Sequence, residues 1–544
     1  MLLLFFSSVF IIPALMGWGK LLEKIIPADL CGVSGKSLNG ILFLGLLLSV
    51  VSFFIPLDLN VEIPVVIIGL SIFFREKLYE YFYKIQKKNF GILTFFILII
   101  LYCGSSYPFI VDHFGYYIPT IKWLTEVGIV KGISNLDLIL GQMSVWHILQ
   151  AGFSNFCDPF FKLNSILLII YVFYIIENKS WIHLLFVPFL IFFTQSPSPD
   201  LPVIIFSLII VNEIFTGNKN ISFLFALAVF AFTVKPTVIW LPLFVLLYSV
   251  FSMKMNIQKL IFGSCIFSLF IFKNIWTFGF PVFPVAVLDL GISWKPNPQL
   301  LQSSSEFAIS KTYDGQYTYD EILQFTWLDY IKNWFFVSGI KSVINITFIL
   351  SLIGFIIYGL IQKKKIVSLL VVSVLAKSIL VLLFSAQYRF FLDVFFVIFF
   401  VIGFQILKRK AVIAFSAIVM IIFSGLFTFP AYIQHYIPSF NPGKLIVKKD
   451  LKQLFAPTNY EYKNFTRFKV GNLNFNVSKQ YPFNFETPIP AISTSFVLDY
   501  QKAKIFPQLI DKNDIRKGFI WKKLNSAEEK EVDKAIETIK NDYH

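Results

Sequence analysis

The sequence predicts an all-α, polytopic membrane protein, and three observations lead to this fold class. The chain is 56 % apolar, with a mean hydropathy of +0.72, whereas soluble domains are roughly 45–50 % apolar. Apolar runs long enough to cross a hydrocarbon core of ~30 Å recur along the first four-fifths of the chain. Basic residues gather between alternate runs, as they do in membrane proteins. A soluble multidomain protein is excluded.

The apolar runs predict about 14 transmembrane helices within a membrane domain of residues 1–429. We expect the spans at residues 2–18, 38–56, 61–75, 90–106, 163–177, 180–195, 199–216, 221–234, 236–252, 258–274, 334–360, 366–385, 389–407 and 411–429. Residues 61–75 and 221–234 are shorter than the ~20 residues of a typical span, so these boundaries are the softest.

The basic residues predict the orientation of the chain. They follow alternate spans: Lys20 and Lys24; Arg75, Lys77, Lys84, Lys87 and Lys88; Lys179; Lys219; Lys254 and Lys259; Lys363 to Lys365; and Lys408 to Lys410. All seven clusters fall on one side of the membrane, which the positive-inside rule makes cytoplasmic. Both termini are then extracytoplasmic. The wealth of Phe, Ile, Lys and Asn is typical of an AT-rich bacterial genome, so we expect a bacterial inner membrane protein.

Three stretches outside the spans are expected on the extracytoplasmic side. In the outer loop of residues 107–162, Tyr116–Val130 and Leu138–Phe153 have helical spacing of apolar residues, and Trp123 and Trp146 suit interfacial helices. The second stretch, residues 275–333, is a long loop of the kind that is usually functional. Residues 430–544 are polar and predict a small mixed domain that ends in a charged helix from Ser526 to Lys540.

Several function classes are disfavoured. The excess of 47 basic over 32 acidic residues is explained by the cytoplasmic loops, and no basic, aromatic-rich module for nucleic acid is present. The cysteines are scattered, at positions 31, 103, 157 and 265, so neither a disulfide framework nor a zinc site is expected. The segment from Gly32 to Ser37 resembles a phosphate-binding loop, but Leu30 stands where that motif needs glycine.

Charged residues near the membrane are costly, which makes each of them a functional candidate. Five of these come from separate segments and share the extracytoplasmic ends of predicted spans: Asp112, Asp200, Lys235, Lys273 and Arg389. Each of these five residues also has a simpler structural explanation. Asp112 suits a solvated loop, Asp200 suits a helix N-terminus, and the cations suit interface anchors. His113 is a candidate for proton transfer or metal binding, although a lone histidine carries little weight.

These residues fall in a pattern that resembles the GT-C superfamily of membrane glycosyltransferases. The resemblance covers roughly residues 90–400. Its most specific part is Asp112-x-x-x-Tyr116-Tyr117-x-Pro-Thr-Ile-Lys-Trp123, followed by Ser144-Val-Trp146. Further matches are Ser196-Pro-Ser-Pro-Asp200, Thr233-Val-Lys235-Pro and Gly279-Phe-Pro-Val-Phe-Pro284. The chain departs from the pattern where Tyr117 replaces a histidine, and where Asp137 and Ile139 replace a histidine and an arginine.

The resemblance implies an inverting transfer of sugar from a polyprenyl-phosphate donor to a glycan, lipid or protein acceptor of the cell envelope. It implies Asp112 as the catalytic base, with Asp200 as a second catalytic carboxylate. A phosphate leaving group needs cations to stabilise its developing charge, a role open to Lys235, Arg389 or Lys273. The substrate would contact His113, Tyr116, Tyr117, Trp123 and Tyr388. Some relatives use Mg²⁺ or Mn²⁺, but this sequence has no diagnostic ligand cluster, so a metal stays open.

Two other functions remain. A polymerase or ligase of lipid-linked polysaccharide usually gathers its catalytic groups in one large loop late in the chain, whereas here they begin in the first outer loop. A transporter or flippase of lipid-linked glycans predicts paired charges near the bilayer midplane and internal repeats. The sequence shows no repeat, and its candidate charges lie at the ends of spans.

Overall fold

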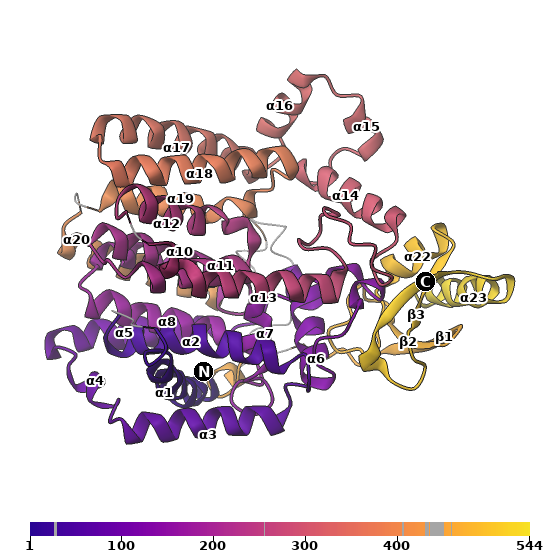
Figure 1. Cartoon of the computed structure of the whole chain (residues 1–544), viewed down its shortest axis with the longest axis horizontal. Coiled ribbons are helices and arrows are strands. Elements are labelled where there is room, and N and C mark those ends of the chain that lie inside the picture. The colour runs from indigo at the N-terminus through magenta and orange to yellow at the C-terminus, as the bar shows by residue number, and fades with distance from the viewer. Residues whose placement is uncertain are drawn as a thin grey trace. The chain divides into compact units, whose positions relative to one another are not determined.

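The computed structural model describes residues 1–26, 30–254, 256–404, 407–429, 435, 451–458 and 460–543. It is mostly helical, at 67 %, and its long apolar helices are compatible with a membrane protein (Figure 1). Within the described ranges, seven helices are long and apolar enough to cross a membrane. They are Leu2–Leu22, Gly32–Val51, Lys87–Gly104, Ile257–Phe278, Ile340–Gln362, Lys365–Phe384 and Arg409–Thr428.

The chain forms two compact units. The first contains Met1–Leu201, Leu269–Leu300 and Lys410–His544, and the second contains Pro202–Ser268 and Leu301–Arg409. The two described termini of the chain therefore belong to the same unit, although more than 500 positions separate them.

Helices of the first unit follow the predicted apolar runs. They are α1 (Leu2–Leu22), α2 (Gly32–Val51), α3 (Leu59–Arg75), α4 (Glu80–Tyr83), α5 (Lys87–Gly104), α6 (Ile118–Glu126), α7 (Val145–Ala151), α8 (Leu163–Glu177), α9 (Val187–Leu190) and α20 (Arg409–Thr428). α13 (Ile261–Phe278) contributes its second half. Residues 180–195, predicted as one span, instead form three short pieces, Trp181–Leu185, α9 and Ile191–Phe193. Side chains at the start of α8 donate hydrogen bonds to the backbone carbonyls of residues 193–195.

Close packing through glycine joins α1 to its neighbours. A methyl group on Gly19 would lie 1.9 Å from the carbonyl oxygen of Lys36 on α2, and one on Gly40 would lie 1.9 Å from that of Leu15 on α1. Gly17 faces Gly69 of α3 in the same way, at 1.9 Å. Small residues at such contacts let helix backbones approach closely, which drives helix association in membranes.

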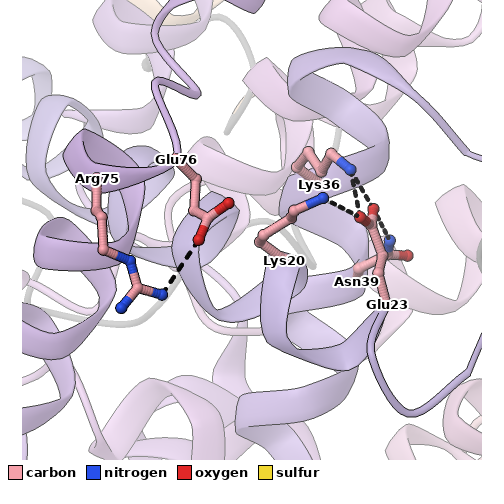
Figure 2. A network of polar contacts seen from close by, with 6 residues as sticks. All are labelled: Lys20, Glu23, Lys36, Asn39, Arg75 and Glu76. Carbon is pink, nitrogen blue, oxygen red and sulfur yellow. Dashed lines mark hydrogen bonds and ion pairs between the residues drawn. The ribbon is translucent and has the colours of Figure 1, made fainter.

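A polar network lies where α1 ends and α2 begins. The Lys36 ammonium contacts both carboxylate oxygens of Glu23, and the amide of Asn39 donates to Glu23 at 3.3 Å. Lys20 lies 3.5 Å from the same carboxylate. Figure 2 shows all four side chains converging, with the separate pair of Arg75 and Glu76 beside them. Two of the basic residues predicted to face the cytoplasm, Lys20 and Arg75, therefore lie at the same end of this helix group.

Helices of the second unit pack as an apolar bundle. They are most of α10 (Asp200–Phe215), α11 (Ile221–Val234), α12 (Trp240–Phe251), α17 (Ile340–Gln362), α18 (Lys365–Phe384) and α19 (Leu392–Gly403). Outside the long helices lie α14 (Pro298–Thr312), α15 (Tyr319–Leu323) and α16 (Trp327–Phe335). α17 and α18 run side by side (Figure 1).

The C-terminal residues form a mixed module, yellow in Figure 1. Strand β1 (Phe465–Val470) pairs antiparallel with β2 (Leu473–Ser478), with Phe465 opposite Ser478 and Val470 opposite Leu473. Strand β3 (Ile505–Leu509) pairs antiparallel with β4 (Phe519–Lys523). Helices α22 (Thr494–Lys502) and α23 (Ser526–Tyr543) accompany them. The charged helix predicted from Ser526 is confirmed. Residues 430–434 and 436–450 of the predicted domain lie outside the described residues.

Candidate functional site

Asp112 stands directly before an uncommon backbone element. It caps a π-helix of five residues, His113–Tyr117, which continues into α6. π-Helical turns are rare and are frequently found at functional sites. The Asp112 side chain is half-buried, while His113, Tyr116 and Tyr117 are buried. The element therefore places one partly accessible carboxylate beside three buried polar rings.

His147 of α7 joins the two tyrosines of the π-helix. Its ring is fully buried and lies 5.0 Å from the ring of Tyr116 and 4.9 Å from that of Tyr117. Its Nε2 lies 3.1 Å from the carbonyl oxygen of Pro197, and its Nδ1 has no hydrogen-bond partner among the described residues. An orphaned buried nitrogen of this kind calls for an explanation, such as a bound water or substrate group.

The loop that leads to Asp200 is held by buried side chains. Asn164 donates to the carbonyls of Phe193 (2.8 Å) and Ser198 (3.0 Å), and it accepts from the indole of Trp146 (2.7 Å). The carbonyls of Thr194 and Gln195 accept from Ser165 (3.1 Å) and Lys162 (2.7 Å) respectively. Irregular backbone at membrane depth is tolerated only where protein groups or a lined cavity satisfy it. Four side chains here, His147 included, meet that condition.

Asp200 begins α10 at the end of this loop. Ser198 Oγ donates to its carboxylate at 3.1 Å, and the Asp200 backbone N–H donates to Ser198 Oγ at 3.3 Å. The Tyr117 hydroxyl reaches the same serine at 3.5 Å, a long hydrogen bond. The π-helix and the Asp200 loop are thus connected through Tyr117 and Ser198, and Asp112 directly precedes the same π-helix. A role of Asp200 at its helix N-terminus fits this geometry as well.

Burial decides the protonation of the rings in this cluster. It lowers the pKa of His147 to about 3, with the positive charge of Lys273 acting in the same direction. Burial, reinforced by the charge of Lys162, holds the pKa of His113 well below its ordinary value. Burial also raises the pKa of the Tyr116 hydroxyl, and the negative charge of Asp112 adds to this rise. At neutral pH both histidines are therefore neutral and Tyr116 is protonated.

The predicted phosphate ligands Lys235 and Arg389 lie together in the second unit. The Lys235 ammonium donates to the backbone carbonyl of Arg389 at 3.3 Å. Both cations lie over the ring of Phe390, at 5.4 and 5.3 Å from its centroid. The neighbouring Tyr388 is exposed, and its ring lies 5.6 Å from the ammonium of Lys341. Three residues named from the sequence, with Lys341 in addition, therefore form one exposed cationic and aromatic patch.

Lys273 has a different environment. It is buried in the first unit, and its ammonium donates to the carbonyls of Gln142 (2.6 Å) and Met143 (3.0 Å). Two of its three N–H donors therefore hold the backbone before α7. This position explains the residue as a structural cation better than as a phosphate ligand.

The two tryptophans predicted to suit the membrane interface are inside the protein. Trp123 is 1 % exposed and packs edge-on against Phe519, with centroids 5.9 Å apart. Trp146 is fully buried and bonds to Asn164. The expectation of interface-facing rings was wrong: Trp123 packs on an aromatic ring of the C-terminal residues, and the Trp146 indole N–H tolerates burial because a side-chain acceptor meets it.

Comparison with known proteins gives a family and no activity. The family described as "Domain of unknown function (DUF8201)" matches residues 1–396. The chain belongs to this family. No curated protein and no solved structure matches the chain. Both predicted acids and the cationic patch lie within the DUF8201 region, and the C-terminal module lies beyond it.

The C-terminal module nevertheless contacts the DUF8201 region at the π-helix. The ring of Phe114 packs against Tyr460 and Phe485, with centroids 5.6 and 5.1 Å apart. A methyl group on Gly115 would lie 2.9 Å from the ring of Phe483. Lys122 of α6 donates to the carbonyl of Thr487 at 2.9 Å. The polar composition of the tail predicted a separate domain, and no sequence signal pointed to these contacts.

A buried ion pair in the second unit of this DUF8201 protein was not predicted from the sequence. Lys377 of α18 pairs with Asp393 of α19, and the indole of Trp240 donates to the same carboxylate at 2.6 Å. All three side chains are buried. Both charges stand inside predicted spans, which was a usable signal. No cluster of three or more His, Cys, Asp or Glu side chains suited to a metal occurs among the described residues.

Proposed function

We propose that this DUF8201 protein is an inverting glycosyltransferase that acts at the extracytoplasmic face. Its donor is a sugar linked to a polyprenyl phosphate, and its acceptor is a glycan, lipid or protein of the cell envelope. The observation that carries the proposal is the polar cluster in which a π-helix presents Asp112 and a clamped loop presents Asp200. Charged groups in such costly surroundings are functional by default.

The chemistry assigns a role to each acid and cation. Asp112 accepts the proton of the acceptor hydroxyl as that oxygen attacks the anomeric carbon. The bond from the anomeric carbon to the lipid phosphate breaks, and the phosphate leaves with the electron pair. Cationic side chains stabilise the charge that develops on it, a role for which the sequence offers Lys235 and Arg389. Asp200 orients the cluster through Ser198 and Tyr117. Direct displacement inverts the anomeric centre, and no step passes through a metal.

The predicted sidedness is supported by the first unit. The Met1 ammonium donates to the carbonyl of Gln453 at 2.6 Å, and Thr458 donates to the carbonyl of Ser105, beyond α5, at 3.0 Å. Arg516 donates to the carbonyl of Phe54, beyond α2, at 2.6 Å. The start of α1, the end of α2 and the end of α5 were all assigned to the outer side, and each contacts the C-terminal residues. The network of Lys20 and Lys36 lies at the opposite ends of α1 and α2.

The decisive experiment replaces the proposed base. Asp112→Asn keeps the shape of the side chain but removes the proton acceptor. In membrane vesicles given a radiolabelled polyprenyl-phosphate sugar, we expect normal protein abundance and a fall in sugar transfer of about 10²-fold or more. Asp200→Asn is the matched variant. If Asp200 mainly stabilises the N-terminus of α10, this variant protein should lose about 1 kcal/mol of stability and keep its turnover. Near-native transfer by Asp112→Asn would refute its role as the base.

The cations have their own test. Lys235→Gln should raise the donor KM and leave the protein folded, because its side chain is partly exposed and its hydrogen bond to Arg389 goes to a backbone carbonyl. Lys364→Gln, a loop lysine on the predicted cytoplasmic side, is the control and should change nothing. Equal effects of the two variants would show that Lys235 is an interface anchor only.

A second candidate function, transport or flipping of lipid-linked glycans, is favoured by the buried pair of Lys377 and Asp393. Paired charges inside spans are a feature of transporters. Asp393 lies in the first turn of α19, whereas Lys377 stands near the middle of α18, seven residues and about 10 Å from its end. The pair therefore joins the end of one helix to the middle of its neighbour. Transbilayer movement of a fluorescent polyprenyl lipid in proteoliposomes that is abolished by Asp393→Asn would favour transport.

A further inference from the structure

A helix outside the spans presents an apolar face that nothing in the described structure covers. In α16, Trp327, Leu328 and Ile331 are 71 %, 56 % and 49 % exposed. The spacings of one, three and four residues place them on one side of the helix. Lys332, Asp329 and Asn333 occupy the next arc. The exposed face is therefore a continuous apolar strip on an amphipathic helix.

The helix is built firmly enough to present this face. Thr326 and Asp329 form a capping box at its start, which satisfies the first backbone N–H groups. Near the C-terminal end of the helix, Trp334 is buried, and its indole donates to the carbonyl of Ala386 at 2.9 Å. Asn345 of α17 holds the Trp334 carbonyl at 2.8 Å. α16 is thus fixed to the bundle at its C-terminal end, while the apolar strip in its first half stays exposed.

The strip continues into the surface of a helix that can cross a membrane. α16 ends at Phe335 and α17 begins at Ile340, and the exposed apolar residues Phe336, Ile340 and Val343 bridge the two. Only 28 % of the apolar window of α17 is buried inside the protein, so its remaining surface suits lipid. Continuity with that surface keeps the strip at the bilayer and argues against a soluble partner.

We propose that α16 is a membrane-surface element that lies in the lipid headgroup layer, with Trp327, Leu328 and Ile331 inserted among the upper acyl chains. Tryptophan suits this layer because its ring is apolar and its N–H is polar. Lys332 and Asp329, on the neighbouring arc, face the headgroups and water. The inference does not depend on the proposed transfer of sugar. It depends only on α17 crossing a membrane.

The test measures the surroundings of Leu328 in the full-length protein. Cysteines 31, 103, 157 and 265 are replaced, and Leu328→Cys carries an environment-sensitive fluorophore in vesicles of phosphatidylcholine and phosphatidylglycerol. Ser305→Cys on α14, an exposed polar position, is the matched control. We expect lipids with a quencher high on the acyl chain to quench the Leu328 label several-fold more than the Ser305 label, and aqueous iodide to do the reverse.

Two outcomes would overturn the proposal. Equal quenching of both labels by iodide would place α16 in water. Protection of the Leu328 label from iodide and lipid quenchers alike, with energy transfer that rises with protein density, would make a second copy the occupant. Trp327→Cys repeats the measurement on the same strip if the Leu328 variant does not fold. Introducing Ile331→Glu should lower the lipid quenching of the Leu328 label and leave the Ser305 label unchanged.

Discussion

Removing the side chain of Asn164 should release the loop that presents Asp200. This fully buried amide makes three hydrogen bonds at once: with the Trp146 indole and with the carbonyls of Phe193 and Ser198. Asn164→Ala leaves one buried donor and two buried acceptors without their partner. Each such group costs about 1–3 kcal/mol, and local relaxation recovers part of this cost. We therefore expect local destabilisation of about 3 kcal/mol.

Hydrogen exchange measures this loss directly. A fall of about 3 kcal/mol in the free energy of local opening accelerates amide exchange roughly 10²-fold. We expect that acceleration in residues 193–201 and the start of α8, with the C-terminal module unchanged. Asn178→Ala is the matched control, because Asn178 ends the same helix, is exposed and makes one local hydrogen bond to the Tyr174 carbonyl. Unchanged exchange in Asn164→Ala, or equal effects of both variants, would refute the clamp.

Three further variants test the surroundings of the site. Phe483→Ala removes the ring packed on Gly115 and should speed amide exchange of residues 113–117 about fivefold, for about 1 kcal/mol of lost contact. Asp137, whose pKa burial raises to about 7, accepts from Ser493. Its stabilising contribution is complete below pH 3.8 and is lost as pH rises through 7, so the protection factors of amides in α22, which correct for the intrinsic rise of exchange with pH, should fall from pH 5 to 8. Glu62→Gln should cost about 2–3 kcal/mol, because the Glu62 carboxylate accepts three backbone N–H bonds.

Each of these expectations has a control. Phe468→Ala, on β1 of the same module, should leave the π-helix unchanged. Asp137→Asn should abolish the fall of the α22 protection factors with pH, and persistence of that fall would assign it to another group. Glu76→Gln breaks only an exposed pair with Arg75 and should change thermal stability in detergent by less than about 0.5 kcal/mol. A similar loss in both glutamate variants would contradict the role given to Glu62.

The long apolar helices were predictable because hydrophobicity is a local property of the chain. Eleven segments chosen for their length and composition, among them residues 221–234 and 163–177, coincide closely with described helices. The prediction failed at residues 180–195, where the composition suits a span but side chains at the start of α8 capture backbone carbonyls. Competition of that kind involves distant residues, so no window along the sequence reveals it.

The candidate site was predictable as residue types and not as an arrangement. Charge near the membrane singled out Asp112, Asp200, Lys235 and Arg389, because the cost of burying a charge can be judged from the sequence alone. The same cost could have singled out Lys377 and Asp393, since both stand inside apolar runs. Lys273 matched the same criterion, but its bonds to two carbonyls give it a structural position.

Composition and hydropathy along the chain were enough to predict a helical, apolar protein with clustered basic residues and a polar tail. What those charges and that tail contact became visible only in the folded chain. Packing brings Phe483 onto Gly115, more than 360 positions away, and sets Tyr117 beside Ser198. The physical reason is that hydrophobicity and charge belong to individual residues, whereas a hydrogen bond or a ring contact requires two groups to meet in space. The chain order places no constraint on which two they are.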